Sequence, residues 1–248
     1  MIIIKSAQEI EIMRQAGQIA AEALLHLSKM IKPGITTAKL DLLARSFIQN
    51  HHAKPAFLGY RGFPASICTS LNEEVVHGIP GLRRMVEGDI ISIDVGVSYK
   101  GYYGDAACTF PVGKISALAR KLIDVTRESL IQGIKKAVPG NRLFDISHSI
   151  QAFVEKHGFS VVRNYVGHGI GSAMHEEPQV PNFGLPGKGL VLEEGMVLAI
   201  EPMVNVGTWE VKTLKDQWTV VTKDKSLSAH FEHTVAILKS GPKVLTTL

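Results

Sequence analysis

The sequence is poor in cysteine and has no long apolar run. Two cysteines in 248 residues, Cys68 and Cys108, cannot form a disulfide framework, so we expect a protein of a reducing compartment. No apolar stretch approaches the ~18 residues that a membrane-spanning helix needs. The short apolar start has no basic segment before it and is followed by Glu9 and Glu11, which is not typical of a secretory signal. These absences favour a cytoplasmic protein without a membrane partner.

Several catalytic and nucleotide-binding motifs are also missing. The chain has no Cys-x-x-Cys, no His-Glu-x-x-His, no phosphate-binding Gly-x-x-x-x-Gly-Lys-Ser/Thr and no Gly-x-Ser-x-Gly elbow. The glycine-rich segment 167–171 resembles a dinucleotide fingerprint only loosely, because no helix is signalled after it. A formal net charge of +4, spread along the chain, does not indicate a specific nucleic-acid partner.

The sequence does have the composition of an ordinary globular protein. Apolar residues make up 45% and charged residues 20% of the chain, which excludes a disordered chain and a coiled coil. At roughly 150 residues per domain, the length predicts one to two domains. A chain of this size can bury one sizeable core.

Helix signals occur in two similar pairs. The first pair begins at a capping box, Ser6 with Glu9 three residues on, followed by apolar residues at helical spacing. A Pro-Gly dipeptide interrupts each pair, at 33–34 and at 139–140, and these breaks lie 106 residues apart. The predicted helices cover residues 6–30, 37–50, 116–137 and 143–157.

Strand patterns repeat at nearly the same interval. Residues 87–94 and 194–201 both consist of Glu-Gly followed by an apolar strand that ends on an acid. We therefore predict a single domain over 1–248, built from similar halves of roughly 1–113 and 114–248. Such halves usually pack about a pseudo-two-fold axis and contribute their strands to one shared sheet.

Four carboxylates lie in segments that otherwise resemble buried strands. Asp94 and Glu201 end the two repeated strands, and Glu232 lies in a later apolar strand. Asp105 follows Asp94 by 11 residues across a turn predicted within 97–101, so these two acids could face each other on paired strands. A buried ionised carboxylate must pair, take up a proton or bind a metal ion. No basic residue stands at a comparable position in these strands to serve as the partner.

Two divalent cations would neutralise the four formal charges. A single buried acid would favour a salt bridge or a helix cap, but four in one pocket would repel each other strongly. Oxygen-rich ligation suits hard or borderline cations, and hydrolytic two-metal sites hold their ions about 3.5–4 Å apart. The acids therefore predict a dinuclear metal site.

Three histidines accompany the acids. His168 lies in the glycine-rich segment, His175 follows seven residues later, and His77 precedes a glycine. A lone histidine is more often a surface or core residue than a ligand. Glycine neighbours allow the backbone to approach a site closely, which makes these three better candidates.

Together these segments resemble one family, the type I methionine aminopeptidases. The resemblance covers essentially the whole chain, and the set is specific although any one segment alone would be weak. It implies an α+β pita-bread fold, in which two pseudo-symmetric halves form a curved, mainly antiparallel β-sheet covered by helices. The matching segments are 72–80, 94–96, 101–105, 167–171, 175–178, 195–203 and 231–234.

The resemblance also divides the ligands between two metal ions. It implies that Asp94 holds one ion and that His168 and Glu201 hold the other. Asp105 and Glu232 would bridge both. One imidazole with four carboxylates accommodates cobalt, manganese, iron or zinc, so the ligand set does not select the metal.

The activity implied by the resemblance is removal of the initiator methionine from nascent proteins whose second residue is small. A hydroxide between the two ions would attack the first peptide bond. Glu201 would accept the proton of the water and pass it on. His175 would donate to the carbonyl oxygen as charge develops, and His77 would contact the scissile nitrogen.

An apolar pocket for the methionine side chain is implied as well. Familiar bacterial relatives lead us to expect Tyr at position 63, Phe at 174 and often Cys at 57, so this sequence departs from them there. Those differences concern fine substrate preference rather than the chemistry. The positions that match the family pocket are Phe57, Tyr60, Phe63, Cys68 and Trp218, with Met174 beside them.

Two other functions stay open at this point. A proline-directed peptidase of the same fold usually carries an extra N-terminal domain, for which this chain has no room. A non-catalytic pita-bread module that binds protein or RNA usually lacks metal ligands, whereas all five are present here. For the leading function we expect a monomer that meets nascent peptides near the ribosome.

Overall fold

The structure is a computed structural model, and it describes residues 2–247. Its helices follow the predicted pattern, with ends that differ from the predicted ones by three residues at most. The capping box is confirmed, because the Ser6 side chain accepts from the Glu9 N–H while the Glu9 carboxylate accepts from the Ser6 N–H. The helices are α1 Ala7–Ser28, α2 Thr37–Asn50, α3 Ala117–Ile134 and α4 Leu143–Lys156.

The two helix pairs repeat each other in detail. Gly34 and Gly140, the glycines of the two Pro-Gly breaks, both have φ of 89°, a conformation that favours glycine. His51 is the C-cap of α2 and His157 that of α4, and each ring Nδ1 bonds to the carbonyl four residues earlier, at 2.9 and 2.7 Å. The same helix–turn–helix unit therefore occurs twice, while the division of the chain near residue 113 stays a prediction.

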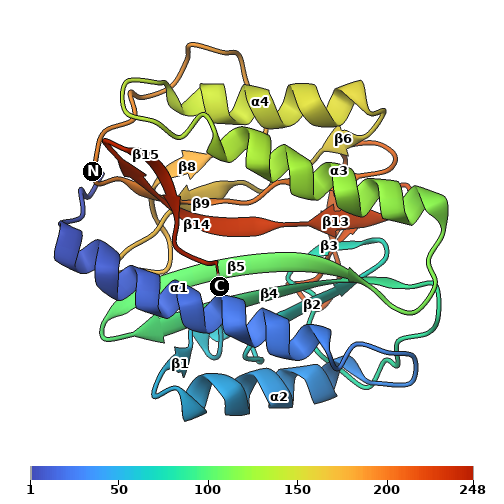
Figure 1. Cartoon of the computed structure of the whole chain (residues 1–248). Helices are drawn as coiled ribbons and strands as arrows, with labels where there is room; N and C mark the ends of the chain where they lie inside the picture. The colour runs from blue at the N-terminus through green and yellow to red at the C-terminus, as the bar shows by residue number, and fades with distance from the viewer. Residues whose placement is uncertain (1, 248) are drawn as a thin grey trace.

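A nine-stranded sheet forms the centre of the molecule, and every ladder in it is antiparallel. Its order is β1-β4-β5-β14-β9-β7-β8, with β2 beside β4 and β15 beside β14. Two three-stranded sheets, β13-β10-β6 and β11-β12-β3, adjoin it (Figure 1). The strands are β1 Lys54–Pro55, β2 Cys68–Leu71, β3 Glu74–Val76, β4 Ile90–Tyr99, β5 Tyr102–Pro111, β6 Ser160–Val161, β7 Gly167–Gly169, β8 Glu176–Val180, β9 Val197–Ile200, β10 Met203–Asn205, β11 Val211–Thr213, β12 Val220–Thr222, β13 Ser228–His230, β14 Glu232–Leu238 and β15 Gly241–Val244.

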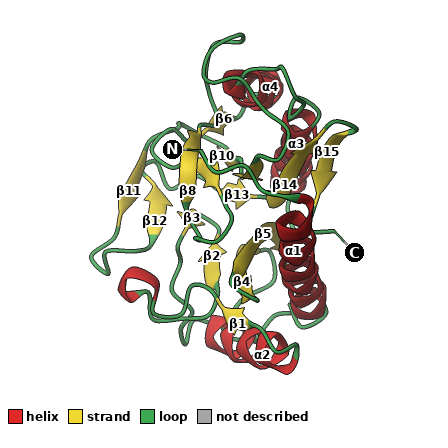
Figure 2. Ribbon diagram, turned by 90° about the vertical axis from the view of Figure 1, so that its left-hand side faces the viewer, coloured by secondary structure: helices red, strands yellow, loops and turns green. Residues whose placement is uncertain are grey.

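The four α-helices lie along one side of the strands, and the short 3₁₀ helix Tyr60–Gly62 lies on the other side (Figure 2). α1 packs on β4 and β5 and beside α2, while α3 packs on α4 and on β10 and β13. Over residues 2–247, none of the four helices combines the length and the apolar character that crossing a bilayer would require.

Strand β4 shows how the sheet separates core from site. Ile91, Ile93 and Val95 are fully buried in one cluster with residues of α1 and α2. Successive side chains of a strand point to opposite faces, so Asp94 and Gly96 face away from this core. The strand therefore buries alternate apolar side chains under the helices and presents its acid on the other face of the sheet.

The turn between β4 and β5 is tighter than predicted. The predicted turn covered 97–101, but β4 continues to Tyr99 and only Lys100 and Gly101 connect the strands. Both have positive φ, 49° and 83°, as the two-residue turns that match the twist of paired strands require. Residues 97–99 are therefore strand rather than turn.

Candidate metal centre and substrate pocket

Three adjacent strands place three acids on one face of the sheet. Asp94 on β4 and Glu232 on β14 both lie opposite Ala107 of the central strand β5. Asp105 lies two residues along β5 and opposite Gly96. Asp94 and Asp105 are thus on paired strands, as predicted, but are diagonal neighbours rather than direct partners. The small side chain of Ala107, between Asp94 and Glu232, leaves the space above the sheet to the carboxylates.

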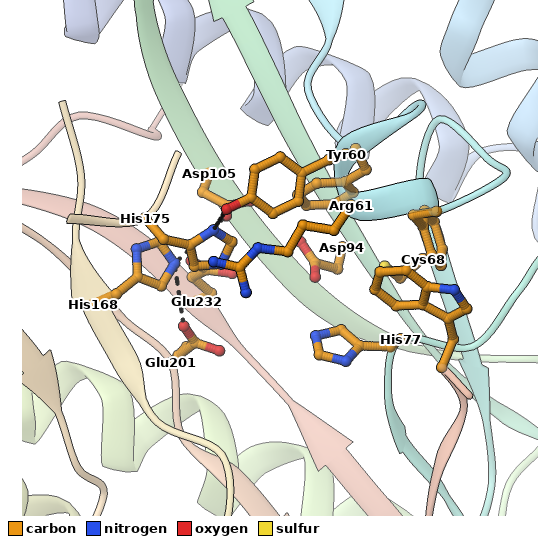
Figure 3. Close-up of a pocket in the computed structure, with 13 residues that line it drawn as sticks. Tyr60, Arg61, Cys68, His77, Asp94, Asp105, His168, His175, Glu201 and Glu232 are labelled. Atoms are coloured by element: carbon orange, nitrogen blue, oxygen red, sulfur yellow. Dashed lines mark hydrogen bonds and ion pairs between the residues drawn. The ribbon is translucent and has the colours of Figure 1, made fainter. Parts of the chain in front are cut away.

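The fourth acid and a histidine join this group from neighbouring strands. Glu201 directly follows β9, and His168 is the middle residue of β7. The His168 Nε2 lies 3.6 Å from the Glu201 Oε1 and 4.0 Å from the Asp105 Oδ2 (Figure 3). One ligand atom each from Asp105, His168 and Glu232 lies within 4.8 Å of the others. The structure therefore brings the five predicted ligands together.

The carboxylates of this cluster lack the partners that buried charges need. Burial raises the pKa of Asp94, Glu201 and Glu232 well above the usual range, and the neighbouring acids raise it further. Burial raises the pKa of Asp105 to about 7. Three oxygens, Asp94 Oδ1, Asp105 Oδ1 and Glu232 Oε1, are buried without a hydrogen bond. Since buried polar atoms nearly always have partners, these oxygens fit ligands of a cation.

The orientation of the His168 ring also fits a bound cation. Its Nδ1–H donates to the Gly169 carbonyl at 2.8 Å, so its Nε2 carries a lone pair. Burial, with a smaller effect of the nearby His175 ring, lowers the pKa of His168 to about 3, so the imidazole is neutral at pH 7. A lone pair aimed at the Glu201 carboxylate is repulsive unless a cation lies between them. Metal-binding histidines characteristically donate their other N–H to a carbonyl in this way.

The cluster forms the floor of a cavity of ≈ 140 Å³. Every predicted catalytic, substrate and metal residue lines it, and Arg61 joins them (Figure 3). The lining residues are Phe57, Tyr60, Arg61, Phe63, Cys68, His77, Asp94, Asp105, His168, His175, Glu201, Trp218 and Glu232.

Apolar side chains build one wall of the cavity, beside the acids. Phe57, Phe63 and Cys68 are buried in one cluster with Met174. The Trp218 ring meets the Phe63 ring edge-on, with centroids 5.1 Å apart. A cavity with an acidic floor and an apolar wall suits a substrate that carries both a polar end and an apolar side chain.

Gly96 sets the position of this wall, which leads to a first prediction. A Cβ at residue 96 would lie 2.6 Å from the Phe57 Cε1 and 3.0 Å from the Met174 Cε. Gly96→Ala should therefore push Phe57 into the pocket, lowering the free energy of unfolding by about 1–3 kcal/mol and raising KM for the substrate. Denaturant unfolding and steady-state kinetics measure the two effects. The double variant with Phe57→Leu should recover both, and an unchanged Gly96→Ala protein would contradict the prediction.

Two further histidines flank the cavity. The Tyr60 hydroxyl lies 2.8 Å from the His175 Nδ1, and the His175 ring centroid lies 4.3 Å from that of His168. Partial burial lowers the pKa of His175, and the positive charge of Arg61 lowers it further. Burial also lowers the pKa of His77, to about 4. Both rings are therefore neutral at pH 7, and a neutral ring carries a single N–H donor.

Sequence reasoning missed two residues of this site. His230 is buried, and its Nε2 lies 3.6 Å from the Glu201 Oε2. Its signal was available, because His230 precedes Glu232 by two residues and such neighbours share a face of a strand. Arg61 is exposed at the mouth of the cavity and has no comparable signal beyond its place after Tyr60.

Comparison with known proteins assigns the chain to a family. The sequence pattern described as "Metallopeptidase family M24" matches residues 11–239. The chain belongs to metallopeptidase family M24. It is 63% identical over 247 residues, 99% of both chains, to a protein of Clostridium acetobutylicum named methionine aminopeptidase.

Solved structures of this family share the fold. The crystal structure of the methionine aminopeptidase from Thermotoga maritima superposes with a TM-score of 0.99 at 50% identity, with complete coverage of both chains. The prolidase from Pyrococcus horikoshii superposes with a TM-score of 0.81 at 26% identity, and the match covers 99% of this chain and 63% of the prolidase. The pita-bread fold expected for this M24 chain is confirmed.

Proposed function

We propose that this chain is a metal-dependent methionine aminopeptidase that releases an N-terminal methionine followed by a small residue. The observation that carries the proposal is the set of unpaired buried carboxylate oxygens on the floor of an apolar pocket. The 63% identity to a protein named methionine aminopeptidase supports it. We assign the metal ligands as Asp94, Asp105, His168, Glu201 and Glu232.

Two divalent ions in this cluster would lower the pKa of a water molecule and polarise the substrate carbonyl. Glu201 is the residue to accept a proton from the attacking water and to deliver it to the departing nitrogen. It lies at the edge of the cavity floor, beside His168. Cobalt, manganese, iron and zinc all suit one imidazole with four carboxylates.

His175 is the residue to stabilise the carbonyl oxygen. When the Tyr60 O–H donates to its Nδ1, the proton of the neutral ring is on Nε2 and can be donated to the substrate. His77 lies at the other side of the cavity, where its ring meets the Trp218 and Tyr165 rings edge-on. From there it can contact the scissile nitrogen.

The two ends of the substrate have separate places. The methionine side chain fits the apolar wall, where a flexible thioether packs well against aromatic rings. A second cavity of ≈ 200 Å³ shares His77, His175 and Glu201 with the first and extends to Asn164 and Tyr165. The rest of the peptide would extend into this second cavity. Only the first residue would then fit beside the apolar wall, which accounts for cleavage of one residue at a time.

A cytoplasmic location fits the two free cysteines, Cys68 and Cys108. We further infer that the enzyme acts as a monomer on nascent peptides near the ribosome, with no specific nucleic-acid or membrane partner. The single cavity that contains every assigned residue supports a site that needs no second chain.

Peptide hydrolysis tests the proposal directly. The protein, freed of metal and reloaded in turn with each of the four ions under anaerobic conditions, should release methionine from Met-Ala-Ser. Met-Leu-Ser, with its larger second residue, should react at least about 100-fold more slowly, because its side chain must pass between His77 and His175, which the two cavities share. Absence of methionine release with all four ions would overturn the proposal.

The alternative is a proline-directed peptidase, which the structural similarity to a prolidase keeps in view. An Ala-Pro substrate distinguishes the two functions in the same assay. Methionine aminopeptidase activity predicts rapid cleavage of Met-Ala-Ser and negligible cleavage of Ala-Pro, and the reverse order would identify a proline-directed enzyme.

A further inference from the structure

The imidazole of His230 is buried beside the metal centre without a hydrogen-bond partner for its Nε2. The residue is 2% exposed, and its Nε2 lies 3.6 Å from the Glu201 Oε2. That separation is too long for a hydrogen bond. A buried donor or acceptor without a partner costs about 1–3 kcal/mol, so a role in the occupied site would explain why this one is present.

Two imidazoles approach different oxygens of the same carboxylate. The His168 Nε2 faces Oε1 of Glu201, and the His230 Nε2 faces Oε2, both at 3.6 Å. Because the ring proton of His168 is on Nδ1, its Nε2 can only accept or ligate. His168 and Oε1 therefore suit one cation together. The other oxygen of Glu201, Oε2, then faces His230, and a hydrogen-bond donor there would satisfy its lone pairs.

The backbone of His230 is held firmly by the strand that carries Asp105. The Thr109 hydroxyl donates to the His230 carbonyl at 2.8 Å and accepts from the His230 N–H at 2.9 Å. Ser92 bonds the same hydroxyl at 2.8 Å, and all these atoms are buried. This arrangement fixes His230 relative to β5. Fixed partners around metal ligands orient them and strengthen metal binding.

We propose that His230 is a positioning residue whose Nε2–H donates a hydrogen bond to the Oε2 of Glu201, which turns Oε1 toward the metal. The two histidines then have opposite tautomers: His168 presents a lone pair to the site and His230 presents a proton. This inference rests on the proposed function only in taking Glu201 as a metal ligand.

Two substitutions at His230 test the role of the donor. His230→Leu removes the hydrogen bond but keeps the site filled, and it should weaken Mn²⁺ binding by about 10–100-fold in calorimetric titrations. It should also lower kcat more than it raises KM, because Glu201 is then misplaced. His230→Gln retains an N–H donor at a similar distance from the backbone. Its Mn²⁺ affinity should therefore stay within about threefold of that of the parent.

A matched control comes from the next histidine along the chain. His233 points to the opposite face of the same segment, where its Nδ1 bonds the Thr246 hydroxyl at 2.8 Å. His233→Gln should bind Mn²⁺ like the parent. Thr109→Val removes the hydroxyl that holds the His230 backbone but keeps the imidazole, so it should cause an intermediate loss of Mn²⁺ affinity. This variant tests the inference if His230→Leu fails to fold.

Two results would overturn the inference. Parental Mn²⁺ affinity in His230→Leu would show that the donor has no role. Nitrogen couplings from two imidazoles in the electron spin echo spectrum of the Mn²⁺ protein, reduced to one in His230→Leu, would make His230 a direct ligand instead. Both readouts are independent of peptide hydrolysis, so they stand apart from a failure of the proposed activity.

Discussion

Glu201→Gln is expected to lower kcat by at least about 10³-fold at saturating metal. General acid–base catalysis alone contributes roughly 10²–10⁴-fold, and the amide is also a poorer metal ligand than the carboxylate. The amide cannot take up the proton of the attacking water. It would also direct an N–H₂ group toward an imidazole that the carboxylate faces in the parent, at 3.6 Å.

The measurement is methionine release from Met-Ala-Ser, with the bound metal quantified in the same samples. Glu210→Gln is a suitable control, because the Glu210 side chain is 44% exposed and pairs with the exposed side chain of Lys223, at 3.0 Å. Surface pairs of this kind contribute little, so that variant should keep the parental kcat. Retention of a tenth of the parental kcat by Glu201→Gln with full metal content would remove Glu201 from the mechanism.

The metal-free protein is expected to lose stability as the pH rises from about 7 to 9. Burial raises the pKa of Asp105 to about 7 and raises those of Asp94, Glu201 and Glu232 as well. Above about pH 7 the folded state binds more protons than the unfolded state, in which these acids ionise near pH 4 and the histidines have already lost their protons. The free energy of unfolding therefore falls as the pH rises, opposite to the behaviour of acids with lowered pKa values.

Asp105→Asn reverses this penalty in the metal-free state. It removes one buried charge, so the metal-free variant should melt about 4–8 °C above the metal-free parent at pH 8, the shift that ~2 kcal/mol produces in a domain of this size. With Mn²⁺ present the order should invert, because ligand binding stabilises the parent by mass action. Calorimetric scans from pH 7 to 9, with EDTA or with Mn²⁺, measure both. A metal-free parent that gains stability with pH would contradict the interpretation of the cluster.

The sequence was sufficient for the features that local rules determine. Side-chain caps mark helix starts, so Ser6 and the Pro-Gly breaks predicted the helices to within a few residues. The four acids were conspicuous because each interrupts an apolar strand. Their convergence followed from the chemistry, since only a shared cation makes four such carboxylates tolerable together.

Features that depend on register could not be predicted in the same way. The β4–β5 turn includes Lys100 at φ 49°, a conformation that lysine seldom adopts, so no turn residue marked that position. The shorter turn determines that Asp94 lies opposite Ala107 and only diagonal to Asp105. His230 was overlooked for a different reason: its position two residues before Glu232 indicated a shared strand face, but only the fold shows that its ring lies beside Glu201.

The four carboxylates of the site come from strands on either side of the β5–β14 junction, with aspartates on one side and glutamates on the other. Asp94 and Asp105 come from β4 and β5, whereas Glu201 and Glu232 come from the end of β9 and the start of β14. Neither pair alone would balance the charge of two dications. A fragment that ended after β5 would carry only the two aspartates, so the acidic set would be complete only when that fragment reassembled with the rest of the chain.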